Sequence, residues 1–135
     1  MGEPITRVAP RLDLPTVRSQ LSILVADDYP GLAELVAEQI ESLFDVQTVC
    51  ATDGLEALRI ARSNVFDAIV LDLDMPGLSG VQVATALSAS VEAVPCLIAM
   101  TGGGPTLALA VSGLFDHVLI KPVSLDTFAR VLKLG

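Results

Sequence analysis

The chain has 135 residues, of which 52% are hydrophobic and 4% aromatic, and this length and composition predict one domain with a mainly aliphatic core. No apolar run approaches the ~18 residues of a membrane span or forms a signal-peptide core, so we expect a soluble cytoplasmic protein. Residues 1–20 hold three arginines and two acids, which leaves 5 basic and 14 acidic side chains in residues 21–135. The resulting net charge of −9 disfavours a nucleic-acid partner and favours a cation or a basic protein surface.

Residues 1–20 contain three prolines and little periodicity, which predicts a flexible arm or linker ahead of a domain over residues 21–135. From residue 21, short apolar runs alternate with segments of helical spacing, and Asp53 and Ser124 are the expected caps of two of those helices. The expected strands are 21–26, 46–51, 66–71, 95–100 and 117–120, and the expected helices are 30–44, 53–63, 79–89 and 124–134. This alternation is typical of a doubly wound, five-stranded parallel α/β sheet with helices on both faces.

The two cysteines, Cys50 and Cys96, both lie inside apolar strand-like runs. This placement predicts buried free thiols rather than a disulfide framework or a metal clip.

Polar residues stand where four of the expected strands end: Asp27 with Asp28, then Asp72, Thr101 and Lys121. Each alone could be a helix cap, a turn former or a surface lysine, but caps do not explain four strand ends at once. In an open parallel sheet, ligands bind beyond the carboxyl ends of the strands, so these side chains are expected to share one site. Clustered carboxylates suit Mg²⁺, and a carboxylate beside a metal and a lysine can attack phosphorus as a nucleophile.

The same residues, in this order, carry a family resemblance. The pair Asp27-Asp28, "DLDMPGLSG" from Asp72, "AMTG" around Thr101 and "KPV" from Lys121 resemble the receiver domain of bacterial two-component response regulators over about residues 21–135. "ATDGLEAL" at 51–58 resembles the family's junction between second strand and second helix. The resemblance implies a flavodoxin-like fold with strand order 2-1-3-4-5, in a stand-alone receiver or the receiver of a hybrid histidine kinase.

The resemblance also implies a role for each residue. Asp72 would accept a phosphoryl group from a histidine kinase or histidine phosphotransfer protein, and Thr101 and Lys121 would bind the phosphoryl oxygens. Mg²⁺ would be held by the side chains of Asp28 and Asp72 and by the backbone carbonyl of Asp74, with Asp27 close by and acting partly through water. The peptide bond from Lys121 to Pro122 would be cis. Such a chain is not an enzyme beyond self-phosphorylation from a phosphodonor and slow autodephosphorylation.

Two features depart from the family pattern. Val118 stands three residues before the lysine, where the family usually has an aromatic residue or a histidine. His117 precedes it, and strand alternation predicts the opposite face for its side chain unless the local register is shifted. The segment from Thr101 to Lys121 looks shorter than in most receivers, so we expect a short or irregular fourth helix. Residues 102–115 carry no charge, and we expect residues 102–120 to contact a partner or a second copy, or to form a poorly ordered connector.

Parts of the sequence also resemble or permit other assignments. "DLDM" resembles the start of haloacid-dehalogenase-type phosphohydrolases, although there the nucleophile lies on the first strand and the acidic pair comes last. A receiver-like scaffold that works without phosphorylation is a second alternative. An FMN site is disfavoured because the sequence supplies no aromatic pair to stack on the flavin. "TGGGPT" is glycine-rich but lacks the lysine of a phosphate loop, so a flexible turn is expected there.

The first third of the domain is strongly acidic. Residues 21–58 contain eight acids and no lysine or arginine. This stretch is either a solvated acidic face or, as the family resemblance suggests, a first helix that meets a basic phosphodonor helix.

Overall fold

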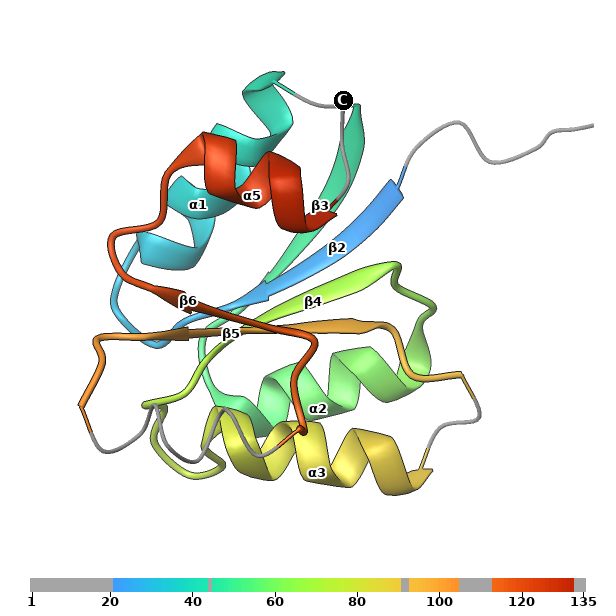
Figure 1. Ribbon diagram of the computed structural model, residues 1–135. Helices are drawn as coiled ribbons and strands as arrows, with labels where there is room; N and C mark the ends of the chain where they lie inside the picture. Colours follow the sequence, from blue (N-terminus) through green and yellow to red (C-terminus); the bar gives the residue numbers. More distant parts are fainter. Residues whose placement is uncertain (1–20, 44, 91–92, 105–112, 133–135) are drawn as a thin grey trace, which may run out of the picture.

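The structure is a computed structural model that describes residues 21–43, 45–90, 93–104 and 113–132. Its centre is a five-stranded parallel sheet in the order β3-β2-β4-β5-β6, with α1 and α5 on one face and α2 and α3 on the other (Figure 1). In chain order the elements are β2 (Leu21–Ala26), α1 (Leu32–Leu43), β3 (Val46–Ala51), α2 (Gly54–Ser63), β4 (Ala68–Asp72), α3 (Gly80–Ser90), β5 (Cys96–Thr101), β6 (His117–Ile120) and α5 (Leu125–Leu132). The predicted fold class and strand order 2-1-3-4-5 are confirmed, whereas the expected fourth helix falls mainly on residues 105–112, outside the described residues.

The sheet is apolar on both faces because both are covered by helices. In β2, Ile23 and Val25 belong to the hydrophobic cluster under α1 and α5, and Leu24 and Ala26 belong to the cluster under α2 and α3. All four side chains are fully buried. Continuous apolar character is expected of strands buried on both faces, and this is why the strands could be located from composition.

The first helix differs in detail from its prediction. It begins at Leu32 and not at Pro30, since the backbone turns at Gly31 with φ +78° and the Leu32 N–H donates to the Tyr29 carbonyl at 3.0 Å. Leu35 is apolar but is 50% exposed on this helix. The buried face is formed instead by small and branched residues, namely Ala33, Val36, Ala37 and Ile40.

Both expected helix caps are present. The Asp53 carboxylate accepts a hydrogen bond from the Glu56 N–H at 2.8 Å and begins α2. The Ser124 hydroxyl accepts one from the Thr127 N–H at 3.2 Å and begins α5. A side chain of this kind satisfies an N–H group that has no partner inside the helix.

The cysteine prediction was right about bonding and wrong about depth. Cys50 and Cys96 are in no disulfide, but both are only half-buried. Cys50 lies on β3, which is an edge strand, and Cys96 is the first residue of β5, so neither is fully covered. Burial and the acids of α1, Glu34 first among them, raise the pKa of the Cys50 thiol.

The last strand pairs with β5 in regular register, Ile98 opposite His117 and Ala99 opposite Val118. Val118 packs against the cluster under α2 and α3, while His117 lines a groove with Val131 on the other side. The register is therefore not shifted, and His117 and Val118 lie on opposite faces as expected. Among the described residues, no helix has the length and apolarity needed to cross a membrane.

Candidate functional site

The sheet brings the expected site residues to one edge. Asp27 follows β2, Asp72 ends β4, Thr101 ends β5 and Lys121 follows β6, so all four stand at carboxyl ends of parallel strands. Thr101 lies on the strand next to Asp72, because Asp72 is paired with Met100. The arrangement brings carboxylate, hydroxyl and ammonium groups together at this edge of the sheet.

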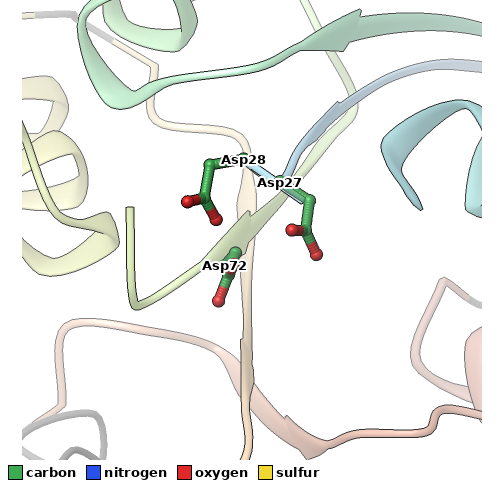
Figure 2. Close-up of side chains that lie close together, drawn as sticks. All are labelled: Asp27, Asp28 and Asp72. Atoms are coloured by element: carbon green, nitrogen blue, oxygen red, sulfur yellow. The ribbon is translucent and has the colours of Figure 1, made fainter. Parts of the chain in front are cut away.

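Three carboxylates form the centre of the site. One oxygen each from Asp27, Asp28 and Asp72 lies within 4.8 Å of the other two, and their side chains are grouped between β2 and β4 (Figure 2). Asp27 is fully buried and Asp72 is 4% exposed, while Asp28 is more exposed than either. Such a cluster is unfavourable without cations, because like charges repel and burial removes their solvation.

Lys121 is the cation that the protein itself supplies. Its Nζ lies 2.9 Å from Asp27 Oδ2 and 3.3 Å from Asp72 Oδ2. Burial alone would lower the pKa of this ammonium, but the hydrogen bond to Asp27 and the charges of Asp72 and Asp27 outweigh it and raise the pKa. Asp27 was expected beside the metal, and the structure shows that it is also the direct partner of the lysine.

The surroundings of Asp72 disfavour its ionised form. Burial raises the pKa of its carboxyl to about 6, and Asp27 acts in the same direction. The Asp74 N–H, which donates to Asp72 Oδ1 at 3.2 Å, and the ammonium of Lys121 lower the pKa but do not compensate. Because three carboxylates face only one ammonium, a further cation would stabilise the cluster.

Backbone contacts hold the remaining groups in place. Asp27 Oδ1 accepts from the Tyr29 N–H at 3.0 Å, and Thr101 Oγ1 accepts from the Gly103 N–H at 3.0 Å. The fully buried Thr101 therefore uses its hydroxyl oxygen as an acceptor and keeps its O–H proton for donation. The Lys121 N–H donates to the Thr101 carbonyl at 2.9 Å, and the bond from Lys121 to Pro122 is cis, as the resemblance implied.

Two glycines that the sequence interpretation passed over shape the loop behind Asp72. A Cβ atom at Gly54 would lie 1.9 Å from the Leu78 carbonyl oxygen, and one at Gly80 would lie 2.6 Å from the Asp72 carbonyl oxygen. The beginning of α2 thus packs directly on the loop that carries Asp74. A glycine at the first position of each helix, in "TDG" and "LSG", was the available signal, because glycine there is needed only when backbones approach closely.

The donor set fits a hard divalent cation. Mg²⁺ prefers carboxylate oxygens as ligands, and Asp28 and Asp72 supply them, with Asp27 in the same cluster. Asp74, the expected backbone ligand, follows Asp72 by two residues and has an exposed side chain, so its side chain is not part of the buried cluster.

An open parallel sheet in this order, with an acidic cluster and a lysine at its carboxyl edge, is the architecture of receiver domains. The response regulator receiver domain family matches residues 23–133, and the chain belongs to this family.

Individual relatives agree with this assignment. The transcriptional regulatory protein PrrA of Mycobacterium tuberculosis is 41% identical over 117 residues, which cover 85% of this chain and 49% of PrrA. The sensor histidine kinase RcsC of Salmonella typhimurium is 32% identical over 119 residues, 83% of this chain and 12% of RcsC. The chain spans about half the length of the PrrA relatives.

Solved structures match over nearly their whole length. The response regulator TrrA of Thermotoga maritima, in complex with Mg²⁺-BeF, is 28% identical with a TM-score of 0.76 and covers 84% of this chain and 97% of TrrA. The receiver domain of a sensor histidine kinase from Pseudomonas aeruginosa, with a magnesium ion in its active-site cleft, is 25% identical with a TM-score of 0.70 and covers 85% and 96%. Neither the strand order nor the family supports the phosphohydrolase alternative.

Proposed function

We propose that this chain is the phosphoacceptor of a two-component phosphorelay and that Asp72 accepts a phosphoryl group from a histidine kinase or histidine phosphotransfer protein. The observation that carries the proposal is the placement of Asp72. Its carboxylate is almost buried at a strand end, 3.3 Å from a lysine ammonium and beside two further carboxylates. A structural role alone would not favour three carboxylates at one point.

The chemistry follows from the positions of these groups. A carboxylate oxygen of Asp72 attacks phosphorus, the new O–P bond forms as the N–P bond to the donor imidazole breaks, and that nitrogen keeps the electron pair. Lys121 lies where its ammonium can attract the phosphoryl oxygens, and the O–H of Thr101 can donate to them. The side chains of Asp28 and Asp72 and the backbone carbonyl of Asp74 would hold Mg²⁺, with Asp27 acting partly through water, and the ion would neutralise charge on the transferring group.

The test is intact-mass analysis after incubation with acetyl phosphate and Mg²⁺. The native chain should gain a single phosphoryl group in a Mg²⁺-dependent way, Asp72→Asn should gain none, and Asp126→Asn, the same change at an exposed position of α5, should still be labelled. Equal labelling of Asp72→Asn would contradict the acceptor assignment. Absence of labelling in the native chain would favour the unphosphorylated scaffold, and continuous turnover of p-nitrophenyl phosphate would favour a phosphohydrolase.

We further propose that the phosphodonor docks beside this site on α1. A groove of about 470 Å³ runs from Lys121 along α1 and is lined by apolar groups that include Leu32, Leu35 and Phe128. Leu35 is 50% exposed, and Glu34 and Glu38 stand on the same helix. A helix with an apolar ridge and basic flanks would match this surface.

Charge should govern the rate of that encounter more than the final affinity. Phosphotransfer from the cognate donor should therefore slow with added salt and in Glu34→Lys with Glu38→Lys. A rate insensitive to both changes would leave the acidic stretch as a solvated face.

For the output surface we propose residues 102–120, of which 105–112 lie outside the described residues. Ile120, on the edge strand β6, is 55% exposed. Binding of Thr101 to the phosphoryl group would order this segment for a partner or a second copy. Hydrogen exchange of residues 102–115 with and without beryllofluoride tests this, and unchanged protection together with unchanged self-association in Leu109→Lys would leave a simple connector.

A further inference from the structure

A second groove lies at the opposite edge of the sheet from the acidic cluster. It has a volume of about 450 Å³ and lies at the amino ends of four strands, where Leu21, Cys96 and His117 meet Val131 and Leu132 of α5. The described part of α5 spans 8 residues and ends at Leu132, which lines the groove together with Leu21, the first residue of β2. Leu21, Val131 and Leu132 are only partly buried, so apolar surface is open to a further segment.

Two carboxylates border this groove. Asp67 Oδ2 accepts from the Ser22 N–H at 2.7 Å, and Asp116 Oδ2 accepts from the Leu97 N–H at 2.8 Å. These bonds hold both carboxylates at the starts of β2 and β5, where they line the groove with the apolar side chains. A segment with apolar side chains between basic ones would match both features of this surface.

We propose that residues 11–18 of the same chain, "RLDLPTVR", occupy this groove. Leu12, Leu14 and Val17 supply apolar side chains, and Arg11 and Arg18 supply charges opposite to those of the groove. The net charge of residues 21–135 is −9, so the arginines of the arm are attracted to the domain as a whole.

The tether makes this docking favourable. Leu21 itself lines the groove, and Val17 precedes it by four residues, which limits their Cα separation to about 14 Å. A segment held this close has an effective concentration in the millimolar range, so modest complementarity is enough to keep it bound. The arm then covers the end of the sheet that the described part of α5 leaves open, and this role is independent of phosphorylation.

Hydrogen exchange on the full chain tests the proposal. The variant Leu14→Asp with Val17→Asp removes two apolar groups near Leu21, and Ile5→Asp with Val8→Asp makes the same chemical change farther along the arm. Exchange at the amides of Ser22, Leu97 and Val131 should be at least about threefold faster in the near variant, with α1 unchanged as the internal reference and no change in the distant variant.

A second measurement uses Cys96, which lines the groove. In a Cys50→Ser background, its alkylation should be several-fold faster in the near variant and should accelerate with salt when the arm is native. Unchanged exchange and alkylation in the near variant would overturn the proposal and assign the groove to residues 133–135 or to a separate partner. Equal effects of the two variants, or a change spread over α1 as well, would also overturn it, because neither outcome places residues 11–18 in the groove.

Discussion

Replacing Asp72 by asparagine should stabilise the domain in the absence of divalent cations. Burial and the neighbouring Asp27 raise the pKa of Asp72 from 3.8 to about 6. An acid whose pKa is higher in the folded state binds more protons there than in the unfolded state between these two values. Stability is therefore lost as the pH rises through this window, and at about pH 7.5 the loss amounts to about 3 kcal/mol. Asparagine removes the charge and can still accept the hydrogen bond from the Asp74 N–H.

Urea unfolding followed by circular dichroism at about pH 7.5 in EDTA measures the difference directly. Asp72→Asn should raise the free energy of unfolding by up to about 3 kcal/mol, and the gap should fall to about half near pH 5 and almost vanish below pH 4. Asp74→Asn, with its exposed side chain, should change stability by no more than about 0.5 kcal/mol. Added Mg²⁺ should stabilise the native chain more than Asp72→Asn and so narrow the gap. Equal or lower stability of Asp72→Asn, or a gap independent of pH, would refute this reasoning.

Three further substitutions test individual contacts in and around the site. Gly54→Ala should weaken Mg²⁺ binding at least about fivefold in isothermal titration, because the new Cβ displaces the loop at Leu78. Gly102→Ala should not, because beyond its chain neighbours no heavy atom of the described residues lies within 4 Å of its Cβ position. Equal affinities would show that the contact serves packing alone. Lys121→Met should lower the free energy of unfolding by about 2 kcal/mol in urea, because fully buried Asp27 loses its cation, and an unchanged midpoint would contradict the pairing. Ser124→Ala should cost about 0.5–1 kcal/mol through loss of the α5 cap, measured in the same way, and a neutral result would mean that the 3.2 Å bond contributes nothing.

Much of the fold could be predicted from local patterns. Apolar runs such as 68–71 and 97–100 are continuous because helices cover both faces of the sheet, and this made the strands recognisable. Asp53 and Ser124 were recognisable as caps for a similar reason, since a cap acts within three residues. The first helix was less well predicted. The sequence shows that Leu35 is apolar but not that it stays exposed on the helix while Ala33 and Ala37 are buried.

For the candidate site as well, the sequence indicated the members but not their contacts. Its members could be located from sequence, because the carboxyl ends of parallel strands meet at one edge and polar residues at those ends must converge. Their roles in phosphoryl transfer remain predictions until Asp72 is labelled. Local spacing could not show that Lys121 Nζ lies 2.9 Å from Asp27, a contact between residues 94 apart.

The sequence by itself determined which segments become strands and helices and which chemical groups stand at the strand ends, because those properties depend on the period of apolar residues and on the residue that follows each run. Only the tertiary structure decided what those groups contact. The pKa of Asp72 depends on its depth and on Asp27, and the close approach of Gly54 to Leu78 depends on how α2 packs. The groove near Leu21 depends on how α5 packs beside the starts of the strands. Each is a distance between elements far apart in the chain, set by the order of the strands and the packing of helices on the sheet, which a local pattern does not encode.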